Sequence, residues 1–149
     1  MISKILVPSD GSKTAQLAAR YAVDLAKQLK ASIIALSVID QRSFIAQTVS
    51  AAKTARQNIQ PIEDYLKEAA EEYAEEIKKL CDKNKVASKI SIKIGHPVEE
   101  IVKEARRSKA NLIVMGSRGR SALSATVLGS VSYGVLHDDQ GIPTLIVRG

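Results

Sequence analysis

The chain alternates short runs of aliphatic residues with longer amphipathic segments, and this alternation constrains the fold more than any other feature. Between the runs, apolar residues recur at three- and four-residue steps, which is typical of helices that bury one face. Strands that alternate with such helices predict an α/β fold with a parallel, doubly wound sheet, because right-handed crossovers place helices on both faces. We expect a single domain over residues 1–149. The predicted strands lie at 3–7, 32–39, 86–94, 111–115 and 143–147.

The four predicted helices differ in clarity. The first starts after Ser12, a good N-cap residue, and the second starts near Pro61. The third follows a Gly-His-Pro turn at 95–97, and the fourth, near 130–137, contains Tyr133-Gly134, which we expect to interrupt it. Residues 41–60 have no clear period and predict a long connection. The apolar stripe expected on the first helix is Leu17, Ala18, Tyr21, Ala22, Leu25 and Leu29.

Composition excludes several classes of function. The net charge of +6 is compatible with nucleic-acid binding, but the basic residues are spread along the chain, there is no Trp, and the only Phe is Phe44. We therefore do not expect a nucleic-acid partner. No segment reaches the roughly 18 apolar residues that span a membrane. The only cysteine, Cys81, reads as a buried helix residue and fits a reducing compartment, so we expect a cytoplasmic protein.

A glycine-rich segment follows the fourth predicted strand and closes at the start of the last helix, with the spacing Gly-x2-Gly-x9-Gly-Ser. Glycines let backbone N–H groups approach an anion, and a helix N-terminus adds N–H groups and a positive dipole end. Glycines alone would equally fit a flexible connection. The serines and arginines between them favour phosphate. The residues that we expect around the phosphate are Gly116, Ser117, Arg118, Gly119, Gly129 and Ser130.

This segment matches neither of the commonest phosphate loops. It lacks the Gly-x4-Gly-Lys-Ser/Thr string, and no Gly-x-Gly-x-x-Gly follows the first strand. In an open parallel sheet, ligands bind beyond the carboxyl ends of the strands. We therefore place the site where residues 7–12, 38–40 and 115–119 leave the sheet.

Together these motifs resemble the universal stress protein family, and in particular its ATP-binding branch. The resemblance is carried by the glycine spacing, by Ile-Leu-Val-Pro-Ser-Asp-Gly-Ser at 5–12 and by Pro-Thr-Leu-Ile-Val-Arg at 143–148. It covers essentially the whole chain, least clearly at 41–60. It implies five strands in the order 3-2-1-4-5, ATP in the crevice between the first and fourth strands, and a homodimer paired through the last strand.

The resemblance also assigns roles to single residues. It implies that Pro8 and Val38 pack on adenine, that Met115 lines the nucleotide site, that Val131 offers a backbone contact, and that Asp10 contacts the nucleoside. By its chemistry alone Asp10 fits equally well as a turn residue that precedes a helix. As a departure from the family pattern, Ser37 stands where many relatives have His.

The sequence shows no catalytic constellation and no metal cluster, so Mg²⁺ would arrive with the triphosphate. Three functions remain open. The leading one is an ATP-binding stress regulator with an unidentified protein partner. The second is a slow ATPase or nucleotide-handling enzyme that uses Asp10 with Arg118 and Arg120. The third is an interaction module that has lost nucleotide binding.

Overall fold

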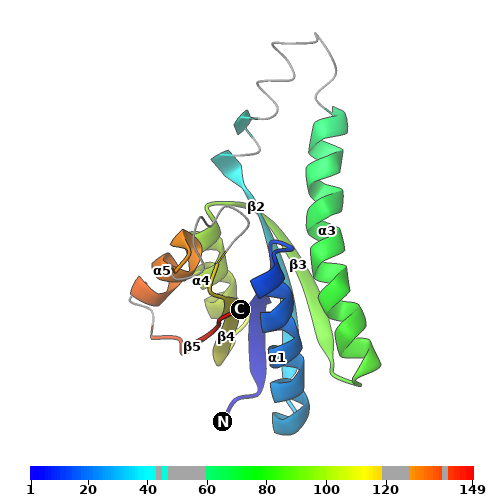
Figure 1. Cartoon of the computed structure of the whole chain (residues 1–149), viewed down its shortest axis with the longest axis vertical. Helices are drawn as coiled ribbons and strands as arrows, with labels where there is room; N and C mark the ends of the chain where they lie inside the picture. The colour runs from blue at the N-terminus through cyan, green and yellow to red at the C-terminus, as the bar shows by residue number, and fades with distance from the viewer. Residues whose placement is uncertain (43–44, 47–59, 119–127, 139–140) are drawn as a thin grey trace.

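A computed structural model describes residues 1–42, 45–46, 60–118, 128–138 and 141–149. Five strands form one sheet in the order β3-β2-β1-β4-β5, and every neighbouring pair is parallel (Figure 1). The predicted fold class and strand order are confirmed. In chain order the elements are β1 (Lys4–Pro8), α1 (Lys13–Leu29), β2 (Ser32–Asp40), α3 (Gln60–Lys83), β3 (Ser88–Gly95), α4 (Pro97–Arg107), β4 (Leu112–Gly116), α5 (Ser130–His137) and β5 (Thr144–Val147).

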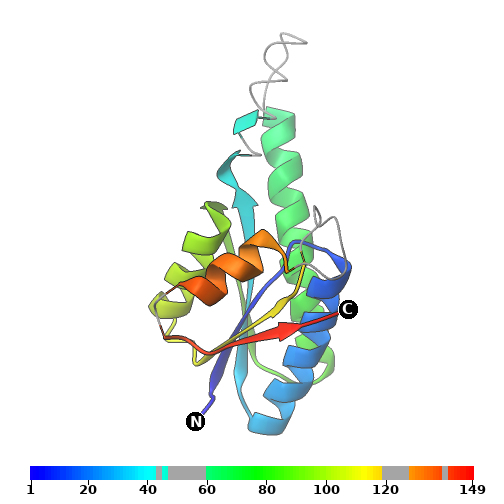
Figure 2. The same ribbon diagram turned by 60° about the vertical axis from the view of Figure 1, so that its left-hand side comes forward.

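Helices cover both faces of the sheet, α1 and α3 on one side and α4 and α5 on the other (Figure 2). Side chains of a strand alternate between faces. In β1, accordingly, Ile5 and Val7 enter the core beneath α1 and α3, whereas Leu6 enters the core beneath α4 and α5. Both cores bury aliphatic side chains completely, which explains why the central strands read as continuous apolar runs.

Helix α1 begins as predicted, because the Ser12 side chain accepts a hydrogen bond from the Ala15 N–H. The predicted buried stripe is only partly right. Ala18 and Ala22 are buried, but Leu17, Tyr21 and Leu29 are between 39% and 52% exposed. The helix lies close to the sheet, so small side chains fit its inner face where larger ones do not. The buried residues of α1 are Thr14, Ala15, Ala18, Ala19, Ala22, Val23 and Ala26.

The expected interruption of the last helix is wrong, since α5 runs continuously through Gly134. The glycine has a packing role instead. A Cβ placed on Gly134 would lie 2.6 Å from Cγ2 of Val98, at the start of α4. The missing side chain therefore lets α5 approach α4 closely.

The remaining predictions concern the edges and the core. β3 is an edge strand and is half-exposed, as its alternation predicted. Cys81 lies on α3 and is fully buried, also as predicted. Most of the predicted connection at 41–60 lies outside the described residues. Within the described part of the chain, no helix has the length and apolar character that crossing a membrane requires.

Candidate functional site

The turn that leaves β1 (residues 9–12) is held by short hydrogen bonds. The Ser9 N–H donates to the Leu36 carbonyl over 2.8 Å, and the buried Ser37 hydroxyl donates to the Ser9 carbonyl over 3.1 Å. Asp10 accepts the Ser12 N–H on Oδ1 at 2.9 Å, which is the geometry of an Asx turn. The turn role of Asp10 is thus observed, and its contact with the nucleoside remains a prediction.

The turn that leaves β4 is fixed against the first turn of α1. A Cβ on Gly116 would lie 2.5 Å from Thr14 Oγ1 and 2.7 Å from the Thr14 backbone carbon, so only glycine fits. The Thr14 hydroxyl donates to the Arg118 carbonyl over 2.5 Å. The Ser117 N–H donates to the Val147 carbonyl over 2.9 Å, which ties the same turn to β5. The carboxyl ends of β1 and β4 therefore share one rigid corner.

Gly129 connects this corner to α5. Its N–H donates to the Ser117 carbonyl over 2.7 Å, and its own carbonyl accepts the Tyr133 N–H. Gly129 is the N-cap of α5 and supplies no side chain to the helix end. The N–H groups of Ser130, Val131 and Ser132 are those of the first turn, which have no intrahelical acceptor. We call this first turn, with Gly129, the α5 anion site, since its N–H groups and dipole favour negative charge.

A buried hydrogen bond sets the position of the α5 anion site. The Ser132 hydroxyl, which is 2% exposed, donates to the Gly116 carbonyl over 2.7 Å. Ser130, by contrast, is exposed at the helix end. The two serines of this turn thus have different roles: one anchors the helix to β4, and the other faces outward.

Three apolar residues of the predicted nucleotide site lie on the α4 and α5 side of the sheet. Met115 is buried there, and Val38 and Val131 are half-buried against the same cluster. Pro8 is buried at the last position of β1, opposite Leu36 of β2. The structure therefore brings the predicted apolar residues of β1, β2, β4 and α5 together at one end of the sheet.

The Arg118 side chain makes a contact outside that group. The Arg118 guanidinium donates to the Gly149 carbonyl over 3.4 Å. Its contact with phosphate remains a prediction. Gly119 and Arg120 lie outside the described residues.

Two contacts at the turns of the site involve residues that the sequence did not single out. The Thr14 hydroxyl donates to Arg118, and the ring of Tyr73 lies against Gly11. Each contact joins segments distant along the chain, which a local pattern does not reveal. Among the described residues, no group of three or more His, Cys, Asp or Glu side chains is arranged to hold a metal ion.

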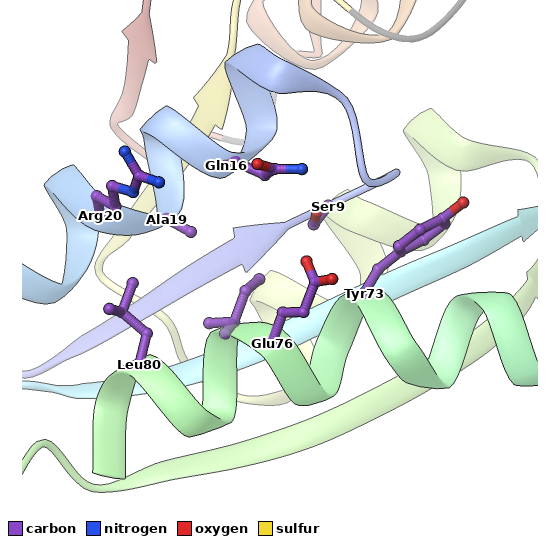
Figure 3. A pocket seen from close by; sticks show the side chains of 8 residues that line it. Ser9, Gln16, Ala19, Arg20, Tyr73, Glu76 and Leu80 are labelled. Atoms are coloured by element: carbon purple, nitrogen blue, oxygen red, sulfur yellow. The ribbon is translucent and has the colours of Figure 1, made fainter. Parts of the chain in front are cut away.

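A cleft of about 190 Å³ opens on the other face of the sheet, between α1 and α3 (Figure 3). Ser9 lines it at the end of β1, so the cleft reaches the rear of the turn that carries Asp10. The full lining is Ser9, Gln16, Ala19, Arg20, Tyr73, Glu76, Ile77 and Leu80.

A parallel 3-2-1-4-5 sheet with a glycine-capped helix at the carboxyl ends of its central strands defines a class of doubly wound α/β proteins. In this class, ligands bind beyond those strand ends. A sequence model described as the universal stress protein family matches residues 1–148. The chain belongs to this family.

The family relationship extends to individual proteins. Universal stress protein MJ0577 of Methanocaldococcus jannaschii is 34% identical over 99% of this chain and 96% of its own length. The solved structure of MJ0577 superposes with a TM-score of 0.82, at 32% identity, and the match covers 100% of this chain and 97% of that one.

Two more distant structures share the fold. One is a universal stress protein in complex with cAMP, with 24% identity, a TM-score of 0.62, and 99% and 97% of the two chains covered. The other is the Archaeoglobus fulgidus universal stress protein in complex with dAMP, with 17% identity, a TM-score of 0.62, and 99% and 98% covered.

Proposed function

We propose that this protein is a stress-response regulator that binds ATP in the crevice between β1 and β4, with the triphosphate on the α5 anion site. The observation that carries the proposal is the position of that site. The Ser132–Gly116 and Gly129–Ser117 hydrogen bonds place the first turn of α5 at the carboxyl end of β4. The glycine N-cap makes no side-chain hydrogen bond to the first-turn N–H groups of α5, and such groups have no intrahelical acceptor.

In this proposal the phosphates lie against Gly116 and Gly129 and bind the first-turn N–H groups of Ser130 and Val131. The Ser130 hydroxyl adds a donor, since its side chain is exposed at the helix end. Ser117 contributes its hydroxyl, because its N–H already donates to the Val147 carbonyl. Arg118 contributes positive charge after its side chain turns away from the Gly149 carbonyl.

The nucleoside lies toward β2 and β1. Pro8, Val38 and Met115 offer an apolar surface for the adenine ring, and the Asp10 carboxylate accepts from a ribose hydroxyl. Support comes from the two relatives whose structures hold cAMP and dAMP, which are both adenine mononucleotides. The present chain shares with them the fold that forms the crevice.

The proposal takes the protein as a binder of ATP and keeps slow hydrolysis as the alternative. In the part of the chain that the structure describes, no group of three or more His, Cys, Asp or Glu side chains is arranged to hold a metal ion. Any Mg²⁺ would be held largely by the triphosphate. The slow-ATPase alternative predicts ADP release over minutes to hours, whereas a binder returns intact ATP. We place the protein in the cytoplasm, where ATP is available and a single thiol stays reduced.

We also propose a homodimer that pairs through β5. The carbonyls of Pro143 and Val147 accept hydrogen bonds from β4, so the intervening positions Thr144 and Ile146 turn their backbone groups to the outer edge. All four residues of β5 are half-buried. An edge strand of this kind, with its apolar side chains Leu145 and Ile146, is a template for pairing with a second chain.

The test of nucleotide binding starts with the purified protein. Chromatography of the denatured supernatant identifies any nucleotide that was retained, and ATP titration by calorimetry measures affinity. Gly129→Leu places a branched side chain at the α5 anion site and should reduce ATP affinity at least tenfold. Leu136→Ala is the control, since Leu136 lies on the same helix beyond its first turn and is 45% exposed. A wild-type protein that neither retains nor binds adenine nucleotide would contradict the proposal and favour the interaction-module alternative.

A further inference from the structure

The ring of Tyr73, on α3, lies directly on the backbone of Gly11. A Cβ on Gly11 would overlap the ring at Cε1 and would lie 2.7 Å from both Cδ1 and Cζ. Gly11 has a φ of +79°, in the left-handed region that favours glycine. Tyr73 thus fills the space that any other residue at position 11 would need for its side chain.

This contact is made from the rear of the turn at residues 9–12. The hydrogen bonds of that turn run to β2, through Leu36 and Ser37, or to the start of α1, where the Gln16 side chain donates to the Gly11 carbonyl. On the side of α3, the ring of Tyr73 lies against Gly11.

The cleft between α1 and α3 lies beside the Tyr73 ring, so the ring is what supports the turn at residues 9–12 on this side. Ser9 and Tyr73 both line it, so open space of about 190 Å³ already lies beside the ring. Figure 3 shows Tyr73 at one end of the cleft, next to the turn, with Leu80 toward the other end. Removal of the ring would extend the cleft beneath Gly11 and give the turn room to relax backward. Backbone that borders an enlarged cavity relaxes to fill part of it.

We propose that Tyr73 is a positioning residue for the nucleoside end of the nucleotide site. The inference rests on the proposed function, because it assigns the nucleoside to Asp10 and Pro8. Pro8 and Asp10 flank Ser9 at the end of β1. The ring of Tyr73 lies against the next residue, Gly11. By holding Gly11 in its left-handed conformation, Tyr73 fixes the direction in which Asp10 leaves β1.

The phosphate end of the site should be insensitive to Tyr73. The α5 anion site is anchored to β4 by the Ser132–Gly116 bond and to Ser117 by the Gly129 N–H. Neither bond involves α3 or the turn at 9–12. Removal of the ring should therefore weaken recognition of the nucleoside and leave recognition of a bare polyphosphate unchanged.

The experiment compares adenosine, AMP, ATP and inorganic tripolyphosphate as ligands, with affinity measured by calorimetry or by competition. Tyr73→Ala should weaken adenosine, AMP and ATP by the same factor, about tenfold, and leave tripolyphosphate within twofold of wild type. Tyr73→Phe should retain wild-type affinities, because the atoms nearest Gly11 are ring carbons. Tyr65→Ala is the matched control, since Tyr65 lies on the same helix and is 67% exposed.

Amide hydrogen exchange supplies a readout independent of any ligand. The N–H groups of Gly11 and Ser12 should exchange faster in Tyr73→Ala, whereas those of Ser132 and Tyr133 should not change. Gly11→Ala provides a second variant, which displaces the ring from the opposite side and should give the same selective loss of nucleoside affinity.

The outcomes separate this inference from the proposed function. If wild type binds ATP and Tyr73→Ala binds all four ligands equally well, Tyr73 does not position the site. If Tyr73→Ala loses tripolyphosphate as strongly as adenosine, its effect is a general loosening of the protein and the inference is wrong. If wild type binds no adenine nucleotide, the proposed function itself fails and this inference fails with it.

Discussion

The Ser132 hydroxyl donates to the Gly116 carbonyl over 2.7 Å, and this buried hydrogen bond joins the first turn of α5 to the end of β4. This bond links the last helix directly to the central sheet at the candidate site. Because Ser132 is 2% exposed, water cannot easily replace the donor.

Ser132→Ala should therefore lower the free energy of unfolding by about 1–3 kcal/mol, the cost of leaving a buried polar group without its partner. It should also weaken ATP binding, because the α5 anion site loses its anchor. Urea unfolding and ATP titration measure the two effects. Ser130→Ala is the control for stability: Ser130 is exposed, so its unfolding should match wild type within about 0.5 kcal/mol. Wild-type stability in Ser132→Ala would contradict the anchoring role.

A buried carboxylate on α4 gives the protein a predictable dependence on pH. The Arg107 guanidinium, which donates to Glu104, and more weakly the ammonium of Lys93, hold the pKa of Glu104 below its ordinary value of 4.5 despite its burial. Glu104 is 2% exposed, and its link to Lys93 joins α4 to β3. A carboxyl group with a lowered folded pKa stabilises the protein above its unfolded pKa. That stabilisation is lost as the pH falls through the folded pKa.

Glu104→Gln should consequently be less stable than wild type at pH 7, by about 1.5–3 kcal/mol, the range for hydrogen bonds to charged groups. The difference should shrink as the pH is lowered below about 4.5 and the wild-type carboxylate takes up a proton. Urea unfolding at pH 7 and at successively lower pH checks this. Glu99→Gln, an exposed position on the same helix, should show neither effect. A difference that grows on acidification would reverse the assigned sign.

Gly134 lies inside a helix, where glycine is less favourable than alanine, and its packing against Val98 explains why it is there. Gly134→Ala gains about 1 kcal/mol of helix propensity but places a Cβ 2.6 Å from Cγ2 of Val98. We expect a net loss of stability of about 1–3 kcal/mol, as for other overpacked contacts. In the Val98→Ala background the clash disappears, so the same substitution should become neutral or stabilising. Thermal or urea unfolding of the four proteins closes the double-mutant cycle, and additive effects would show that the two residues do not interact.

Local patterns in the sequence were sufficient for the strands and for the helix starts. The aliphatic runs predicted β1, β2 and β4, because a strand buried on both faces has few polar residues. The N-cap at Ser12 followed from residue chemistry alone. The strand order, in contrast, came from the family resemblance, since periodicity does not specify which strands are neighbours.

The errors share one physical cause, which is close packing between distant segments. On α1, leucines and alanines both recur at helical spacing, and only the distance to the sheet decides that Ala19 is buried while Leu17 is exposed. Gly134 looked like a break because Val98 lies 36 positions away in the sequence. For the same reason, the positioning roles of Thr14 and Tyr73 required the structure. The nucleotide contacts themselves remain predictions.

The proposed dimer can be tested at a single backbone N–H. Because Val147 and Pro143 face β4, the Ile146 N–H faces the free edge of the sheet. Ile146→Pro removes that donor without removing a β4 hydrogen bond, and proline is tolerated on edge strands. If β5 pairs with its counterpart in a second chain, this variant should be monomeric in sedimentation equilibrium at concentrations where wild type is dimeric. Ile146→Ala is the matched control, since it shortens the same side chain but keeps the N–H, and it should remain dimeric. Monomeric behaviour of both variants would instead assign the contact to the side chain, and a dimer that survives Ile146→Pro would place the interface away from the β5 edge.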